Sequence, residues 1–256
     1  MLGIGLAAAS RGGSAYVHQR LSVGDTLEIG APRALFGIAT AASEHVFIAG
    51  GIGITPIVSM IRWCEARGRP WRLLYCVRTR ARAAYAWTLA RHGDRVLLYV
   101  DEEAGGSLPD LASYLSSVPA GAHVYCCGPA GQMEAVANAA AQAGIPKAAT
   151  HFERFTADAP KAADAARDHA FTVVLNRSGK RIEVASDHTI LMALEKNDIA
   201  VPFSCREGLC RTCELPLLHG EADHRDSVLS DAERAANTCI LPCVSRARSR
   251  ELVLDI

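Results

Sequence analysis

Four cysteines near the end of the chain have a spacing that can bind iron. Cys205 and Cys210 are separated by four residues, Cys210 and Cys213 by two, and Cys243 follows after 29 more. This is the plant-type spacing of a [2Fe–2S] cluster, in which one loop supplies three thiolates and a separate segment supplies the fourth. Gly208 lets the loop backbone turn closely enough for amide groups to reach the sulfurs.

Two alternatives accompany this prediction. A structural zinc site usually has paired Cys-x2-4-Cys knuckles, and here only Cys210 and Cys213 form one. Cys239 competes with Cys243 for the fourth position, because 25 residues separate it from Cys213. The spacing therefore predicts a [2Fe–2S] cluster and leaves its fourth ligand open.

A glycine-rich turn is the second candidate site. Gly50, Gly51 and Gly53 follow an apolar run and precede a helical pattern, where backbone amides and the helix dipole favour a pyrophosphate. Thr55 is a further polar contact and the expected helix cap, with Pro56 as the first helical residue. Because Pro56 replaces the third glycine of the dinucleotide fingerprint, a tight turn without a ligand remains an alternative.

The elements that must position this turn form a βα alternation. Apolar runs predict buried strands at residues 45–50, 72–77, 95–100 and 123–128. Stripes at 57–64 and 133–140 predict helices, so the arrangement implies a parallel sheet with helices on its faces. Cys127, Gly128 and Pro129 end the last strand, at the carboxyl edge where such sheets bind ligands.

A different pattern follows. Residues 157–169 are small, polar and without periodicity, which is typical of an interdomain linker. Beyond them we expect a hairpin of strands at 171–175 and 181–184, a helix at 189–196 and a closing strand at 251–256.

Composition excludes several classes of protein. Lys plus Arg and Asp plus Glu both number 27, so neither nucleic-acid nor anionic-membrane binding is expected. No apolar run approaches the roughly 18 residues of a membrane helix. The N-terminus has no basic residue before its short apolar part and is not expected to be a signal peptide. Clustered cysteines indicate a reducing, cytoplasmic compartment.

Residues 11–256 resemble the phthalate dioxygenase reductase family, which includes the vanillate O-demethylase reductases. The matching motifs are Arg11-Gly-Gly-Ser14, Gly50-Gly-Ile-Gly-Ile-Thr-Pro56, Tyr125-Cys-Cys-Gly-Pro129, His151-Phe-Glu-Arg-Phe155, the cysteine loop, Gly220-Glu-Ala-Asp-His-Arg-Asp226 and Cys243-Val-Ser-Arg-Ala247. The resemblance implies an α/β plus α+β fold. It has a partial FMN-binding barrel at 1–38, an NAD(P)-binding domain at 39–156, a linker at 157–169 and a β-grasp ferredoxin domain at 170–256.

The resemblance also implies cofactor sites. It favours Cys243 as the fourth cluster ligand and places Cys127 near the nicotinamide. Gly12, Gly13 and Ser14 are expected to bind the flavin phosphate. Phe155, or else Phe152, would cover the flavin ring, although core packing is an equal alternative for both.

The choice of nicotinamide nucleotide depends on the residues after the second strand. Arg78, Arg80 and Arg82 follow it with no acid nearby in the sequence. Such arginines could accept the 2′-phosphate of NADPH or form a solvated basic turn. The family habit is NADH, which is therefore the expected cofactor, with NADPH possible.

The implied function is the reductase component of a Rieske-type aromatic-ring oxygenase or O-demethylase. Electrons would pass from NAD(P)H via FMN to the cluster and on to the oxygenase, since a flavin converts a hydride into single electrons. The family's Arg-x-Tyr-Ser segment is missing upstream of Gly12, and 25–30 is the one convincing strand there. We expect that the recorded start lies inside a longer reading frame, or else that flavin binding is defective.

Two other functions are weighed. A one-electron ferredoxin-type carrier fits if flavin and nucleotide functions are lost. A self-contained oxygenase would need a substrate-activating iron or a haem site, and the histidines are too scattered for a facial triad.

Arg211 stands where the family usually has glycine. A cation near the sulfurs should raise the cluster potential. Arg206 and Arg211 could also meet an acidic docking patch on the oxygenase, or else be ordinary solvated side chains.

Overall fold

The computed structural model describes residues 3–7, 10, 12–30, 34–157 and 168–256. The chain divides into two compact units, Met1–Glu153 and Arg154–Ile256. Arg11 lies outside the described residues. So do residues 158–167, which make up most of the predicted linker.

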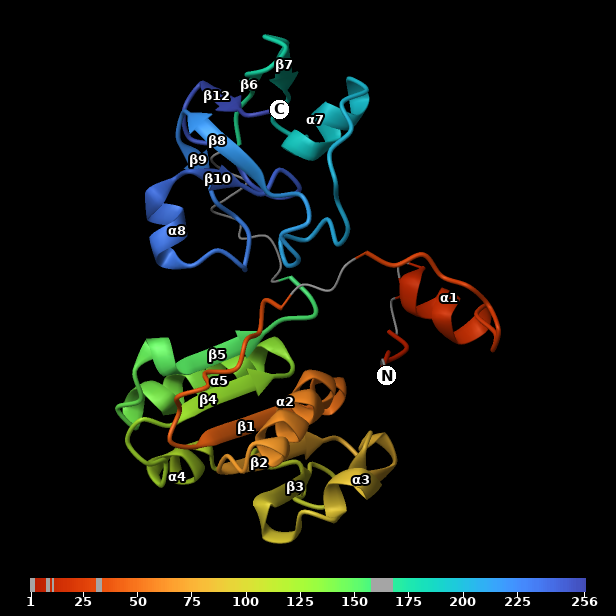
Figure 1. Ribbon diagram of the computed structural model, residues 1–256, viewed down its shortest axis with the longest axis vertical. Helices are drawn as coiled ribbons and strands as arrows, with labels where there is room; N and C mark the ends of the chain where they lie inside the picture. The colour runs from red at the N-terminus through yellow and green to blue at the C-terminus, as the bar shows by residue number, and fades with distance from the viewer. Residues whose placement is uncertain (1–2, 8–9, 11, 31–33, 158–167) are drawn as a thin grey trace. The chain divides into compact units, whose positions relative to one another are not determined.

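The first unit is built on a five-stranded parallel sheet in the order β3-β2-β1-β4-β5 (Figure 1). The strands are β1 His45–Gly50, β2 Trp71–Val77, β3 Val96–Val100, β4 His123–Cys127 and β5 Thr150–Glu153. The four predicted strands are confirmed to within one residue, whereas β5 is not among the predictions. The strand order changes direction between β1 and β4, which is where open parallel sheets bind ligands.

Helices cover both faces of this sheet. They are α2 Ile54–Ala66, α3 Ala86–Ala90, α4 Leu111–Ser116 and α5 Ala130–Gln142, and short 3-10 turns occupy Gly51–Gly53, Arg80–Arg82, Gly93–Arg95 and Lys147–Ala149. Phe47 of β1 packs in the core of α2, whereas Ile48 packs in the core of α4 and α5. Alternate side chains of a buried strand thus fill both layers. None of the helices in the described chain combines the length and hydropathy needed to cross a bilayer.

The predicted start of α2 is wrong. The helix begins at Ile54, and its capping position is Gly53, whose φ and ψ of −60° and −8° are already helical. The 3-10 turn therefore runs directly into the helix, because no residue between them breaks the helical backbone. Thr55 and Pro56 lie within the first turn of α2 instead of at its cap and first position.

The described residues before β1 contain one helix, α1 Gly13–Gln19, where the sequence around Tyr16–Leu21 indicates a short helix. None of its residues is buried. The strand predicted at 25–30 is not formed: these residues have no regular secondary structure, are exposed and pair with no strand of the described chain. A strand needs a neighbouring strand to bond its backbone, and here the described residues supply none.

The second unit contains a mixed sheet in the order β10-β8-β12-β6-β7. Its elements are β6 Phe171–Leu175, β7 Arg181–Val184, α7 Ile190–Lys196, β8 Leu215–His219, β9 Ala222–Asp223, α8 Asp231–Ala236, β10 Cys239–Ile240, β11 Arg246–Ala247 and β12 Glu251–Leu254. The predicted hairpin, helix and closing strand are all confirmed. β12 lies parallel to β6 and antiparallel to β8, and α7 packs its apolar face into the same core.

Candidate functional site

The three closely spaced cysteines lie in the loop between α7 and β8, and Cys243 lies between β10 and β11. Arg206, Gly208 and Arg211 in this loop have φ angles of 57°, 69° and 55°. Each lies in the left-handed region, so the backbone turns sharply around the cysteines. A β-carbon on Gly208 would lie 2.7 Å from Val244. The loop therefore packs tightly against the segment that carries Cys243, in a place where only glycine fits.

The four thiols associate as two pairs. Cys205 hydrogen-bonds with Cys210, and Cys213 with Cys243. The hydrogen bond from Cys243 lowers the pKa of Cys213 to about 7, and the same bond raises the pKa of Cys243. Burial opposes ionisation of Cys210, but hydrogen bonds with Thr212 and Cys205 outweigh it and lower the pKa of that thiol. Cys205 also acts electrostatically on Cys243, so the two pairs belong to one cluster of thiols.

The pairing of the four thiols shows whether these cysteines fit the [2Fe–2S] cluster that the resemblance implies. Among the residues that the structure describes, no three His, Cys, Asp or Glu side chains converge to hold a single metal ion. A Cys-ligated two-iron cluster needs two thiolates on each iron, whereas structural zinc needs four ligands around one ion. The thiols associate two and two, which matches the two thiolates that each iron of the cluster needs. The amide nitrogen of Glu207 also lies 3.3 Å from Cys205 Sγ, a contact that stabilises such thiolates.

Cys239 has a different environment. It lies in β10 opposite Pro216 of β8. Burial raises the pKa of its thiol, which hydrogen-bonds with Glu214. The structure thus brings Cys243, rather than Cys239, to Cys213.

Both loop arginines are held in ion pairs. Arg206 binds the two carboxylate oxygens of Glu195 at 3.0 and 2.5 Å. Arg211 contacts Glu214 at 2.5 Å and Glu233 at 2.8 Å. The carboxylates offset both positive charges, so neither arginine is the uncompensated cation that the sequence suggests.

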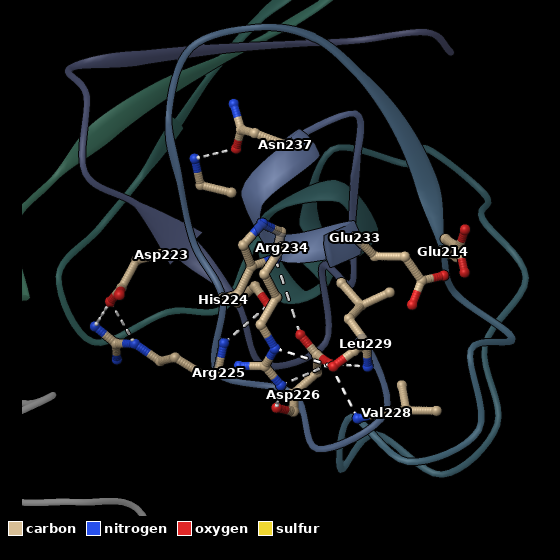
Figure 2. Close-up of polar contacts among 12 residues, drawn as sticks. Glu214, Asp223, His224, Arg225, Asp226, Val228, Leu229, Glu233, Arg234 and Asn237 are labelled. Carbon is tan, nitrogen blue, oxygen red and sulfur yellow. Dashed lines mark hydrogen bonds and ion pairs between the residues drawn. The ribbon is translucent and has the colours of Figure 1, made fainter. Parts of the chain in front are cut away.

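The segment after β9 contacts the loop, and Figure 2 shows the polar contacts within this segment. The carboxylate of Asp226 is buried and accepts the amide hydrogen of Leu229 at 2.7 Å, and Arg234 approaches the same oxygen at 3.3 Å. Next to it, the amide of Ser227 donates to the carbonyl of Gly208 at 3.1 Å. The residue that follows the Gly220–Asp226 motif therefore holds the cysteine loop through a backbone hydrogen bond.

The turns after β1 and β4 meet at the carboxyl edge of the first sheet. A β-carbon on Gly53 would lie 2.1 Å from the carbonyl oxygen of Cys127, and one on Gly50 would lie 2.0 Å from the Gln132 carboxamide. One on Gly128 would lie 3.2 Å from the Cα of Gly50. These glycines let the two turns pack directly against each other, and at Gly51 an added β-carbon would meet nothing within 4 Å, so its backbone is open to a ligand. We call this pair of turns the glycine cradle.

The other predicted nucleotide residues adjoin this cradle. The carbonyl of Gly51 accepts the hydroxyl of buried Tyr75 at 3.1 Å, and the Thr55 hydroxyl donates to a carbonyl of the turn at 3.0 Å. Pro129 precedes α5, and Pro56 lies in the first turn of α2. The contact of Tyr75 with this turn could not be predicted from the sequence, because a tyrosine within an apolar strand indicates only a core residue.

Cys127 and Glu153 are neighbours across β4 and β5. Burial raises the pKa of Cys127 to about 12, and the charge of Glu153 acts in the same direction. Burial also raises the pKa of Glu153. Cys127 is therefore a neutral thiol at the sheet edge. Glu153 could have been noticed only from the His151–Phe155 motif.

The flavin-site predictions fall on exposed or locally bonded residues. Gly12 and Gly13 begin α1, and the Ser14 hydroxyl donates to the Ser10 hydroxyl at 3.0 Å. Phe155 is 49% exposed. Phe152 packs against the α5 side of the core, which agrees with the core alternative for that ring.

The basic turn after β2 has an acidic partner. Arg80 forms two contacts with Glu103, which follows β3. The stretch itself contains no acid, as the sequence shows, and the acid comes instead from the segment after the neighbouring strand.

Comparison with known families gives two matches. The family described as 2Fe-2S iron-sulfur cluster binding domain matches residues 173–248, which include all four paired cysteines. The family described as dimethylamine monooxygenase subunit DmmA-like, N-terminal domain, matches residues 32–150, which include the glycine cradle. The two units thus match separate families.

Individual proteins match the whole chain. It is 45% identical to phenoxybenzoate dioxygenase subunit beta of Ectopseudomonas oleovorans, over 100% of this chain and 78% of that protein. It is 37% identical to phthalate dioxygenase reductase, a solved modular structure for electron transfer from pyridine nucleotides to [2Fe–2S], with a TM-score of 0.66. That alignment covers 99% of this chain and 78% of the solved one. An intact type IV self-sufficient cytochrome P450 monooxygenase is 39% identical with a TM-score of 0.87, covering 98% of this chain and 32% of the larger one.

Proposed function

This chain belongs to the phthalate dioxygenase reductase family, and from that membership we propose that it carries electrons from NADH, through FMN and its [2Fe–2S] cluster, to a Rieske-type oxygenase. It is an oxidoreductase of the electron-transfer type, with a 2Fe-2S ferredoxin domain in its second unit. The oxygenase, rather than this chain, would bind the aromatic substrate.

The cofactors supply the redox chemistry: a flavin accepts two electrons from a nicotinamide and releases them singly. The chain supplies binding and orientation. Gly50, Gly51, Gly53 and Gly128 would hold the pyrophosphate of NADH, with Thr55, Pro56 and Pro129 at the edges of the cradle. Cys127 would lie against the nicotinamide as a neutral thiol.

The remaining site assignments are proposals of the same kind. Cys205, Cys210, Cys213 and Cys243 would ligate the cluster. Gly12, Gly13 and Ser14 would donate hydrogen bonds to the FMN phosphate, and the exposed ring of Phe155 would cover the flavin. All nine cysteines are free thiols, which supports a reducing compartment, and we place the protein in the cytoplasm.

One observation supports this function above the others. A single chain holds both a pairwise thiol cluster and a backbone cradle at a sheet switch point. The thiol cluster suits one-electron transfer, and the cradle suits a dinucleotide. A protein with both can take electrons from a soluble donor and deliver them to a partner.

The test uses protein purified without oxygen. Heat denaturation should release FMN, NADH should bleach the visible absorbance, and a purified Rieske oxygenase added next should be reduced. Bleaching by dithionite but not by NADH would contradict the proposal.

A second candidate is a one-electron ferredoxin-type carrier. It is favoured by the structure of residues 12–30, which contribute a helix without buried residues and no strand. That carrier would contain the cluster but release no flavin, and an external reductase would be needed to reduce it.

A further inference from the structure

The ends of β2 and β3 bring opposite charges together. The two strands are parallel neighbours, so the turns that follow them lie at the same edge of the sheet. The turn after β2 carries Arg78, Arg80 and Arg82, and the turn after β3 carries Glu103. This is the edge at which the cradle lies, one strand away in β1.

Arg80 and Glu103 form a two-point contact. Nε of Arg80 donates to one carboxylate oxygen at 2.5 Å, and Nη2 donates to the other at 2.8 Å. This parallel geometry is the one in which guanidinium groups bind carboxylate or phosphate most specifically. The site on Arg80 that would suit a phosphate is therefore occupied.

The backbone fixes the position of the acid. The amide of Asp101 donates to the carbonyl of Val77 at 3.0 Å, and the amide of Glu102 donates to the carbonyl of Arg78 at 3.3 Å. The two turns are thus bonded through main-chain groups just before Glu103. The backbone therefore places the Glu103 carboxylate next to Arg80, so their contact does not depend on side-chain attraction alone.

In dinucleotide-binding sheets, the residues after the second strand decide between the two nicotinamide cofactors. An acid there holds the ribose 2′-hydroxyl of NADH, whereas an arginine accepts the 2′-phosphate of NADPH. The sequence of this turn, with three arginines, suggests NADPH. The structure supplies an acid, Glu103, from the turn after the next strand, and this acid suggests NADH.

We propose that Glu103 makes this site selective for NADH, because it occupies the guanidinium of Arg80, which would otherwise accept a 2′-phosphate, and adds a negative charge beside it. The inference rests on the proposed function, since it names the nucleotide of the same site.

The test measures binding of two fragments that differ by one phosphate. Calorimetric titration of the full chain with 5′-AMP and with 2′,5′-ADP gives the discrimination directly, and needs neither flavin nor turnover. The unmodified chain should prefer 5′-AMP. Glu103→Gln should strengthen 2′,5′-ADP binding by about twofold to fivefold, the range expected for one exposed ion pair, with 5′-AMP affected much less.

Two controls make the result specific. Glu102→Gln removes the same charge from the adjacent exposed residue and should leave the ratio of affinities unchanged. Arg80→Gln combined with Glu103→Gln should abolish the gain, because the freed guanidinium is then missing. Near-ultraviolet circular dichroism checks that each variant is folded.

The possible failures are distinguishable. If both fragments bind but Glu103→Gln does not alter their ratio, or Glu102→Gln alters it equally, the inference is wrong. A preference of the unmodified chain for 2′,5′-ADP would also overturn it. If neither fragment binds the unmodified chain, the proposed nucleotide site itself is wrong.

Discussion

Cys239 and Cys243 are close in sequence, but their thiols have different partners. Cys243 hydrogen-bonds with Cys213, whereas Cys239 bonds with Glu214. Spacing alone admits both as the fourth ligand, because both follow Cys213 by a suitable number of residues. The difference comes from the strand β10, which holds Cys239 in a ladder with β8.

Cys243→Ser should therefore remove most of the cluster, while Cys239→Ser should retain it. The physical reason is that only Cys243 completes the second thiol pair. Iron content per chain and visible absorbance measure the outcome. Equal loss in both variants would contradict the assignment.

Arg211 combines strain with a local charge balance. Its φ of 55° lies in the left-handed region, where glycine is favoured. Arg211→Gly removes the strain but leaves Glu214 and Glu233 without their partner. Because uncompensated carboxylates disfavour an added electron, the cluster potential should fall by something on the order of tens of millivolts.

Redox titration measures this potential. Arg211→Lys keeps the charge and is the matched control, which should shift the midpoint much less. An unchanged midpoint in Arg211→Gly would refute the electrostatic role.

His224 gives the second unit a pH dependence. Its side chain is 7% exposed, and Nδ1 lies 3.9 Å from the buried carboxylate of Asp226. Neither ring nitrogen has a hydrogen-bond partner in the described structure. Burial lowers the pKa of His224 below its ordinary 6.5, against the opposing charges of Asp226 and Asp223 and together with those of Arg234 and Arg248. The unfolded chain therefore binds a proton first, so stability is full above pH 6.5 and falls below it.

Urea unfolding followed at pH about 7.5 and about 5.5 should show a loss of about 1 kcal/mol that Glu or Asp titration does not explain. His224→Gln should flatten this dependence, while His219→Gln, at an exposed position, should preserve it. If the slope survives in His224→Gln, another group is responsible.

At the scale of elements, local patterns predict what local forces determine. The apolar runs at β1, β2 and β4 are largely buried on both faces, so their composition is sufficient evidence. The stretch at 25–30 alternates polar and apolar residues, as a half-buried strand does. A strand forms only where another strand bonds its backbone, which no local pattern records. The start of α2 was misplaced for a related reason, because a helical turn at Gly51–Gly53 overrides the capping preference of Thr55.

The same distinction applies to the sites. The cysteine loop and glycine turns are predictable because close spacing keeps their groups together. The contacts of Glu103 with Arg80, and of Glu153 with Cys127, join segments that are adjacent only through sheet order. Strand order therefore had to be known before either acid could be placed.

The glycine cradle is tested by adding one methyl group. In Gly53→Ala the new carbon would lie 2.1 Å from the Cys127 carbonyl oxygen, and backbone cannot move away cheaply. The first unit should lose about 1–3 kcal/mol of stability, the usual effect of overpacking, together with affinity for 5′-AMP.

Gly131→Ala is the matched control. Gly131 lies within α5, and an added β-carbon would meet nothing within 4 Å. This variant should gain about 0.5–1 kcal/mol, because alanine favours the helix. Thermal unfolding compares the two, and equal melting temperatures would contradict the close approach of the turns.

At the scale of the whole molecule, the chain joins two units with separate cores and separate chemistry. The parallel sheet offers backbone to a nucleotide, and the mixed sheet carries paired thiols. Each unit matches its own family, while the relatives that span both are electron-transfer or oxygenase proteins. Under the proposed function, reduction by a nucleotide and delivery of single electrons would take place in different parts of one chain.

The most direct measurement of this account is the iron and acid-labile sulfide content of protein purified without oxygen, with its visible spectrum before and after reduction. The account predicts about two irons and about two sulfides per chain, with a colour that bleaches when electrons are added. Colourless protein without sulfide, or one zinc ion in place of the irons, would contradict it.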